Sequence, residues 1–250
     1  MIDKSDPAIS IITAVLNCRR SIEFTIRSIL PQLSNKVEYI IIDGGSTDGT
    51  LDILKKYSDS IDYIVSEPDL GIYDAWNKGI KVSKGNYVAF VGADDVLRGD
   101  IIAKYLSFIN NSPNIDYVSS KAQFDGENSR IFGKEWKWDS FRRYMTVAHV
   151  GSLHRRSLYS QYGFYDTSYK IVGDYEFLLR VGRRLSVGFI DCVGVTMGAN
   201  GVSNKLIHLS LKETLRAKVS TAACNVWIAR FDYFVAYMKF FIRQFFINLR

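Results

Sequence analysis

The chain has 250 residues, of which 47% are apolar and 23% charged. These values are ordinary for a globular domain and exclude a mainly disordered chain. Its three cysteines, Cys18, Cys192 and Cys224, are far apart in the sequence. Neither a disulfide framework nor a cysteine-based zinc site is therefore predicted. The polar first residues predict no secretory signal peptide, so we expect a cytoplasmic, reducing setting.

The net charge of +6 lies in the last part of the chain. Residues 203–250 hold eight Lys and Arg against two acidic residues, Glu213 and Asp232, and this excess equals the net charge of the whole chain. A basic tail on a neutral body indicates a surface partner for the tail. It does not indicate a nucleic-acid-binding core.

Apolar runs alternate with helix-spaced segments in the first half of the chain. The continuous apolar run at 8–16 is typical of a strand buried on both faces. Further strands are expected at 37–42, 61–65, 87–91 and 115–119, and helices at 21–33, 51–57, 72–82 and 101–109. This alternation predicts an α/β fold with a mostly parallel central sheet flanked by helices.

The second half is less regular, with helices expected near 155–162 and at 174–185. No linker rich in Pro or Gly interrupts it. We therefore expect one continuous domain over 1–202, followed by a helical appendage at 203–250.

Acidic residues stand where the predicted strands end: Asp43, Glu67, Asp94 and Asp95. Ligands of parallel sheets bind at that edge. The first strand is not followed by Gly-x-Gly-x-x-Gly, and neither a P-loop nor a Gly-x-Ser-x-Gly motif occurs. A dinucleotide cofactor, a P-loop nucleotidase and an α/β-hydrolase are therefore disfavoured.

Three features have both a functional and a structural interpretation. The Asp94-Asp95 pair would suit Mg²⁺ or Mn²⁺, or one aspartate would simply cap the next helix. The glycines after Asp43 would let the backbone approach a ligand closely, or they form an ordinary turn. Asp174, at the start of a predicted helix, would be a general base or an N-cap.

Taken together, segments 10–17, 38–50, 67–79 and 85–95 resemble family 2 glycosyltransferases with the GT-A fold. The resemblance covers about residues 8–203. The most similar subgroup is that of bacterial enzymes that build O-antigen, capsule or exopolysaccharide repeats. It implies a nucleotide-sugar half at about 1–123 and an acceptor half at about 124–202.

The resemblance also implies roles for individual residues. Asp95 would ligate Mn²⁺ or Mg²⁺, and Asp174 would deprotonate the acceptor hydroxyl. The nucleotide would be held by Thr13, Asn17, Asp43, Asp74, Lys78 and Asp94. The candidates on the acceptor side are His149, Trp138 and Tyr175, with a structural role as the alternative for His149. Trp138, like Trp136 and Tyr73, could stack on a sugar face or pack in the core. Residues 201–203 resemble a loop that closes the family's site.

Two positions depart from the family pattern. Gly173 precedes Asp174 where relatives often have Glu, and Gly92-Ala93-Asp94-Asp95 replaces a strict Asp-x-Asp. The implied reaction is metal-dependent transfer from a UDP-linked sugar to a polyprenyl-diphosphate-linked saccharide. With one candidate base and no candidate nucleophilic carboxylate, we expect single displacement with inversion. The alternatives are a catalytically silent nucleotide-sugar-binding or scaffold protein on the same fold, and a nucleotidyltransferase, for which Arg19-Arg20 is the only hint.

The tail has apolar residues at helical spacing. They are Trp227, Phe231, Phe234, Val235, Met238, Ile242, Phe245 and Leu249. Charged residues interrupt the segment, so it is too polar to span a membrane. It predicts an amphipathic helix at 225–250 that lies on an anionic membrane surface at the inner face of the cell membrane. The alternative is a helix that packs on the catalytic domain or in a homo-oligomer.

Overall fold

The computed structural model describes residues 6–126, 129–198 and 206–248, with side chains to Ile242. The loop expected at 201–203 lies outside the described residues. So do the side chains of Arg243, Phe245, Leu249 and Arg250 in the tail.

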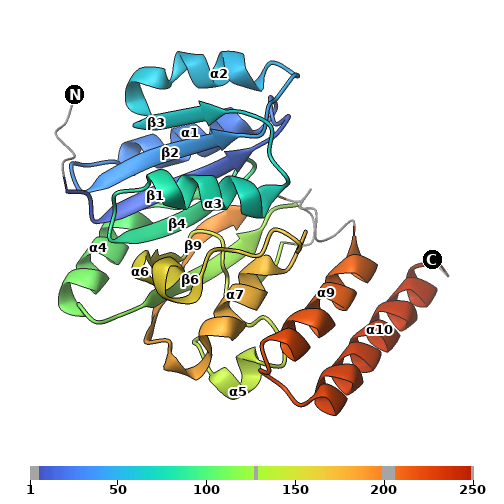
Figure 1. The fold of residues 1–250 in the computed structure, drawn as a ribbon. Coiled ribbons are helices and arrows are strands. Elements are labelled where there is room, and N and C mark those ends of the chain that lie inside the picture. The colour runs from blue at the N-terminus through green and yellow to red at the C-terminus, as the bar shows by residue number, and fades with distance from the viewer. Residues whose placement is uncertain (1–5, 127–128, 199–205, 249–250) are drawn as a thin grey trace.

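A nine-stranded sheet in the order β3-β2-β1-β4-β8-β6-β9-β5, with β7 paired to β6, forms the centre of the molecule (Figure 1). Strands β1 to β4 are mutually parallel, and β6 and β9 are parallel to each other. Strand β8 is antiparallel to both β4 and β6, and β5 is antiparallel to β9. The strands are β1 Ile9–Val15, β2 Val37–Asp43, β3 Tyr63–Ser66, β4 Tyr87–Gly92, β5 Val96–Leu97, β6 Tyr117–Phe124, β7 Ile131–Phe132, β8 Leu153–Arg155 and β9 Val187–Met197.

Helices cover both faces of the sheet, and each face has its own buried core. One core includes residues of α1, α2 and α4, and the other includes residues of α3, α6 and α7, which lie in front of the sheet in Figure 1. The helices are α1 Ile22–Ile29, α2 Thr50–Lys56, α3 Ile72–Val82, α4 Ile101–Asn111, α5 Trp138–Phe141, α6 Ser157–Tyr162, α7 Gly173–Val181, α9 Ile207–Ser220 and α10 Val226–Asn248.

The two cores follow from the period of a strand, in which successive side chains point to opposite faces. Ile9 and Ile11 of β1 join the core under α1, whereas Ile12 joins the core under α3. Strand β2 divides in the same way, with Ile41 on the first face and Ile40 on the second. Continuous apolar runs are therefore required here, because both faces of these strands are buried.

The elements predicted up to residue 111 are confirmed, with ends that shift by a few residues. Three predictions beyond that point were incomplete or wrong, and one long strand was missed. The strand expected at 115–119 extends to Phe124. The helix expected near 155–162 begins at Ser157, because Arg155 ends the short strand β8. The helix expected at 174–185 ends at Val181, where Gly182 adopts a φ of 72°. Strand β9 was not predicted, since its residues are only partly buried and form no apolar run.

Two helices form the C-terminal segment, where one was predicted. Helix α9 packs on α7, and α10 lies beside α9 (Figure 1). Most of the described apolar side chains that the sequence places on one face of α10 are exposed, namely Trp227, Phe231, Phe234, Met238 and Ile242. The side of α10 that faces α9 carries Ala229 and Asp232, both buried. No helix among the described residues is long and apolar enough to cross a membrane.

Candidate functional site

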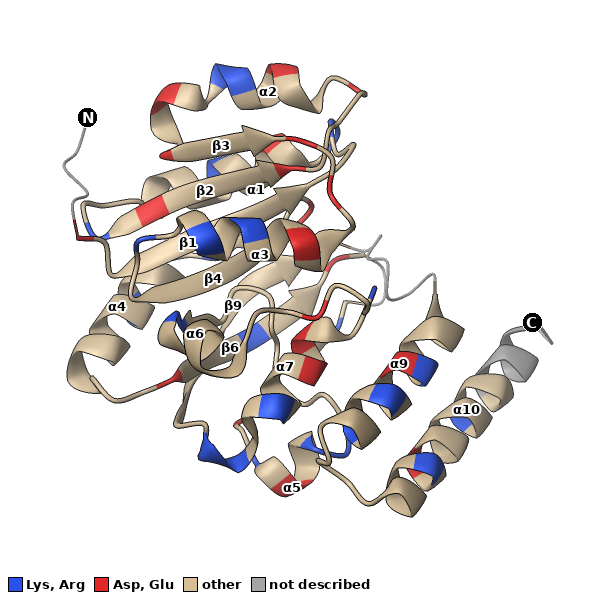
Figure 2. Ribbon diagram, in the orientation of Figure 1, with Lys and Arg blue, Asp and Glu red and all other residues tan. Residues whose placement is uncertain are grey.

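Strand register brings the predicted acidic residues to one edge of the sheet. Asp43, the last residue of β2, pairs with Val15 of β1 and with Ser66 of β3. Gly92, the last residue of β4, pairs with Ala14 of β1, which directly precedes Val15. Acidic segments therefore gather at the carboxyl ends of these parallel strands (Figure 2). This is the edge at which an open α/β sheet binds its ligands.

The Asp43 carboxylate is completely buried and organises the loop after β2. Its Oδ2 accepts the backbone N–H groups of Gly45 and Ser46, each at 3.0 Å, and the Ser66 hydroxyl at 2.6 Å. Its Oδ1 is buried without a hydrogen-bond partner among the described residues. Because an unsatisfied buried oxygen costs free energy, Asp43 Oδ1 fits a donor N–H group supplied by a ligand.

Asn17 joins the end of β1 to the same loop. It adopts a left-handed φ of 52°, which asparagine tolerates better than most residues. Its Oδ1 accepts the Thr47 N–H at 2.8 Å, and its own N–H donates to Ser46 Oγ at 2.8 Å. Thr13, by contrast, lies inside β1, where Oγ1 accepts the Tyr39 hydroxyl at 3.3 Å. The structure does not bring the Thr13 side chain to the surface of the site.

Lys78 ties the segment after β3 to helix α3. Its ammonium lies 2.9 Å from Glu67 Oε1 and 3.7 Å from Asp74 Oδ2, and it donates to the Pro68 carbonyl at 2.9 Å. Although partial desolvation opposes its charge, Glu67, Asp74 and Asp69 together raise the pKa of Lys78. Asp74 also accepts the Leu70 N–H at 3.1 Å. Lys78 and Asp74 therefore stabilise this loop.

Asp94 and Asp95 occupy the turn after β4 but differ in environment. Asp95 is 5% exposed, and its carboxylate accepts the N–H groups of Gly92 at 2.9 Å and Gly198 at 3.1 Å. Burial and the neighbouring Asp94 charge raise the pKa of Asp95 to about 6. Asp94 is only partly buried and forms no ion pair among the described residues.

This acidic pair fits a divalent cation in a limited way. No group of three or more His, Cys, Asp or Glu side chains gathers as a metal site within the described part of the chain. Mg²⁺ is commonly held by one or two carboxylates together with substrate phosphates. A cation beside Asp94 and Asp95 would also relieve the repulsion between them. The residues present therefore fit a cation that shares its ligands with a diphosphate.

Asp174 lies in the first turn of α7 and is held by a tyrosine from α3. The buried Tyr73 hydroxyl is 3.2 Å from Asp174 Oδ1 and 2.7 Å from the Ile171 carbonyl. Gly173 makes this packing possible, since a Cβ there would come within 2.8 Å of the Tyr73 ring. The glycine that departs from the family pattern is thus coupled to the residue that positions Asp174.

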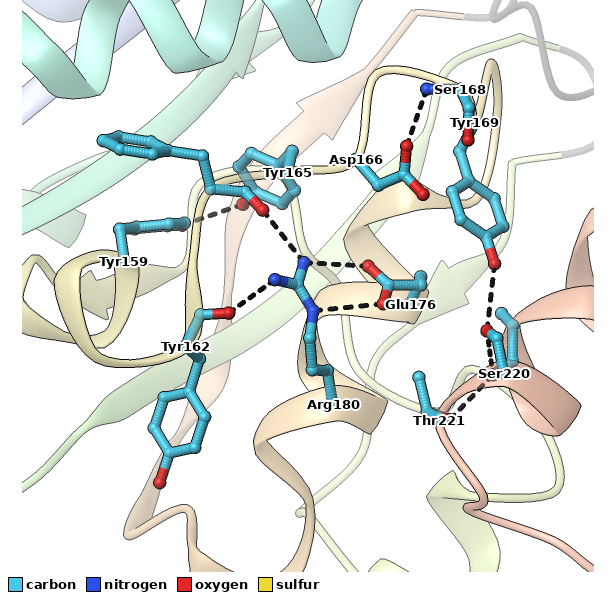
Figure 3. Close-up of polar contacts among 12 residues, drawn as sticks. Tyr159, Tyr162, Tyr165, Asp166, Ser168, Tyr169, Glu176, Arg180, Ser220 and Thr221 are labelled. Carbon is cyan, nitrogen blue, oxygen red and sulfur yellow. Dashed lines mark hydrogen bonds and ion pairs between the residues drawn. The ribbon is translucent and has the colours of Figure 1, made fainter.

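Helix α9 holds the segment that leads into Asp174. The buried Glu213 carboxylate accepts three successive backbone N–H groups, from Lys170, Ile171 and Val172, at 2.8, 2.9 and 3.1 Å. Nearby, Ser220 of α9 lies 3.3 Å from the Tyr169 hydroxyl (Figure 3). The C-terminal segment therefore helps to define the geometry around Asp174.

Helix α7 also fixes the loop that precedes this segment. Arg180 forms a two-pronged pair with Glu176, with separations of 3.1 and 2.9 Å (Figure 3). The same guanidinium donates to the backbone carbonyls of Tyr162 and Phe164. Loop and helix are thereby held as one unit.

His149 is a buried residue that packs against a cluster of aromatic rings. Its ring lies 5.1 Å from Trp76 and 5.5 Å from Phe90, and Nε2 is 3.1 Å from the Tyr165 hydroxyl. Burial lowers the pKa of His149, although the Asp174 charge acts in the opposite direction. This environment favours the structural alternative for His149 over contact with an acceptor.

The other two acceptor-side candidates, Trp138 and Tyr175, lie in different places relative to Asp174. Trp138 begins α5 and packs near Gly182, beyond the C-terminal end of α7, whereas Asp174 is in the first turn of that helix. Tyr175 is buried, donates to the Phe141 carbonyl at 2.9 Å and lines a cavity together with Asp174. The structure therefore brings Tyr175, but not Trp138, to the candidate base.

Sequence reasoning missed the roles of Tyr73 and Glu213. The sequence offered sugar stacking or core packing for Tyr73, and its contact with Asp174 spans 101 positions. Glu213 carried one usable signal, because it and Asp232 are the only acidic residues in the basic segment 203–250. Both are buried with polar partners.

Comparison with known proteins identifies the family and the fold. Residues 10–169 match the model of glycosyl transferase family 2. A "PGL/p-HBAD biosynthesis glycosyltransferase" of Mycobacterium bovis is 31% identical over 178 residues, covering 70% of this chain and 69% of the relative.

Two solved structures share the fold. S. aureus TarS 1–349 in complex with UDP has a TM-score of 0.68 at 18% identity, with coverage of 85% of this chain and 64% of that one. The chain thus spans less than two thirds of the TarS fragment. Glucosyl-3-phosphoglycerate synthase from Mycobacterium tuberculosis, in complex with Mn²⁺, UDP and glucosyl-3-phosphoglycerate, has a TM-score of 0.65 at 18% identity, with coverage of 88% of this chain and 81% of that one. The chain belongs to glycosyl transferase family 2, has the GT-A fold and is a glycosyltransferase.

Proposed function

We propose that this glycosyltransferase moves a sugar, with inversion, from a UDP-linked donor to a polyprenyl-diphosphate-linked saccharide of a bacterial surface polysaccharide. The observation that carries the donor part is the unpartnered, buried Asp43 Oδ1 at the carboxyl edge of the sheet. The imide N–H of a uracil ring would satisfy this oxygen. The UDP complexes of TarS and of glucosyl-3-phosphoglycerate synthase support the choice of nucleotide.

Mn²⁺ or Mg²⁺ would be held in the turn that contains Asp94 and Asp95. Because both hydrogen bonds from Gly92 and Gly198 engage the buried Asp95 carboxylate, we assign Asp94 as the more accessible ligand and Asp95 as the residue that shapes the turn. This division differs from the family-based expectation, in which Asp95 ligates the cation and Asp94 binds the ribose. When bound, the cation would neutralise charge on the leaving diphosphate.

Asp174 would act as the general base. It is a carboxylate without an ion pair among the described residues, and Tyr73 holds it in place. Taking the proton from an acceptor hydroxyl would make that oxygen nucleophilic as it attacks the anomeric carbon. One such carboxylate suffices for a single displacement, and the product would then have the inverted configuration.

The exposed face of α10 would lie on the cytoplasmic surface of the cell membrane, where a polyprenyl-linked acceptor resides. Trp227 is 70% exposed and Phe231 62%, with Arg230 and Lys239 exposed on the same helix. Large apolar side chains flanked by basic ones favour an anionic lipid surface. We expect the protein to sediment with anionic vesicles and to lose much of this binding in Phe231→Ser. Phe24→Ser, at a 67% exposed phenylalanine of α1, is the matched control.

Calorimetric titration of UDP, GDP and dTDP, each with and without Mn²⁺, tests the donor site. UDP should bind most tightly and only with Mn²⁺, and Asp94→Ala should weaken binding by more than about tenfold. Asp95→Ala, at the residue assigned to shaping the turn, is compared with Asp94→Ala, at the assigned ligand. Asp59→Ala, at an exposed aspartate, is a control. If a folded protein binds none of the three nucleotides, the proposal fails and a scaffold role is favoured.

A further inference from the structure

Asp174, the candidate base, lines a cavity whose other walls include the C-terminal helices α9 and α10. The cavity has a volume of about 420 Å³ and lies between the first turn of α7, the segment at 144–145, and helices α9 and α10. These three helices stand side by side in Figure 1. Asp174 and Tyr175 line it from α7, Leu211 and Leu215 from α9, and Tyr233 and Ala236 from α10.

The lining of this cavity is mainly apolar, and its charged groups are largely paired. Lys218 and Asp232 both line it, but they are 2.8 Å apart and almost fully buried. Arg143 also pairs with Asp232 from outside the lining. Asp174 is the lining carboxylate that has no cation partner among the described residues. The cavity thus offers the Asp174 carboxylate, which can accept a hydrogen bond from a hydroxyl group, beside an apolar surface that suits a hydrocarbon.

Helix α10 contributes to this cavity with one side and exposes apolar side chains on the other. Ala229, Tyr233 and Ala236 line the cavity, whereas Phe231 and Phe234 are exposed. Glu213 fixes the α9 wall to the segment that leads into Asp174. An amphiphile that reached the cavity would therefore place its polar end at Asp174 and its apolar part between α9 and α10.

We propose that this cavity binds the apolar part of the acceptor, the hydrocarbon of the lipid that carries the saccharide whose hydroxyl reacts. The inference rests on the proposed function, because it takes Asp174 as the base. It adds that the acceptor is recognised by its aglycone as well as by its sugar, through α9 and α10.

Binding of octyl glucoside and methyl glucoside, measured by calorimetry below the micelle concentration, tests the proposal. Burial of an alkyl chain predicts that octyl glucoside binds at least ~100-fold more tightly. Ala236→Trp, which fills the cavity, should remove this preference. Phe234→Trp, which adds an indole to the exposed side of the same helix, should keep it. Equal binding of the two glucosides, or a preference that survives in folded Ala236→Trp, would overturn the proposal.

Two additions keep the test decisive. If Ala236→Trp does not fold, Thr214→Phe fills the same cavity from α9. UDP with Mn²⁺ is titrated on the same samples and reports separately on the donor site, so failure there concerns the proposed function alone. Saturation with UDP should leave octyl glucoside binding unchanged. Competition between the two would place the alkyl chain in the donor site and overturn the cavity assignment.

Discussion

Replacing Glu213 with glutamine should weaken both the fold and the reaction. In the wild type, Oε1 accepts the Lys170 N–H, while Oε2 accepts those of Ile171 and Val172. Whichever way the glutamine amide turns, its NH₂ group faces at least one of these backbone donors. Since a buried donor without a partner costs about 1–3 kcal/mol, Glu213→Gln should lower the free energy of unfolding by about 2 kcal/mol.

The same change should reduce kcat, because residues 170–172 lead directly into Asp174. UDP binding, at the other edge of the site, should stay as in the wild type. Urea unfolding measures the first effect, and initial rates with calorimetry measure the second. Glu135→Gln, at an exposed glutamate, should stay within about 0.5 kcal/mol of the wild type. Wild-type stability and kcat in Glu213→Gln would refute the role assigned to this carboxylate.

Three further changes follow from individual contacts. Gly173→Ala would push its Cβ into the Tyr73 ring, so we expect a loss of about 1–3 kcal/mol in urea unfolding and a lower kcat. Asp232→Ala leaves buried Lys218 without its anion, which should cost about 3–5 kcal/mol and shows as a lower unfolding midpoint. Burial lowers the pKa of both His149 and His154. The unfolded chain therefore binds more protons below about pH 6.5, and stability should fall from pH 7 to 5 by up to about 1.4 kcal/mol per pH unit for each histidine. His154→Phe should make that slope shallower in unfolding experiments at several pH values.

The sheet could be predicted where both faces of a strand are buried. The apolar runs that became β1, β2 and β4 are visible in the sequence because nearly all of their residues are buried. Strand β9 was missed because its burial is irregular, and the pairing of β6 with β9 includes register shifts. Local periodicity does not report such pairing.

Part of the candidate site could also be predicted from the sequence, and part could not. Asp43 and the Asp94-Asp95 pair could be predicted from their place at strand ends, since register alone brings them to one edge. The contacts around Asp174 could not, because they join distant parts of the sequence. Tyr73 contacts Asp174 across 101 positions, and Glu213 holds the preceding segment across about 40 positions. For α10, helical spacing predicted an apolar face, and the structure shows that this face is turned outward.

The central claim is that Asp174 activates the acceptor, whereas the donor binds at Asp43 and the turn that contains Asp94 and Asp95. Asp174→Asn keeps the shape of the side chain but removes its basicity, and the measurement compares sugar transfer from a panel of UDP-sugars to a membrane lipid extract with calorimetric UDP binding. We predict loss of transfer by at least about 10²-fold, with UDP affinity in Mn²⁺ unchanged. Transfer at the wild-type rate would remove Asp174 as the base and contradict the mechanism.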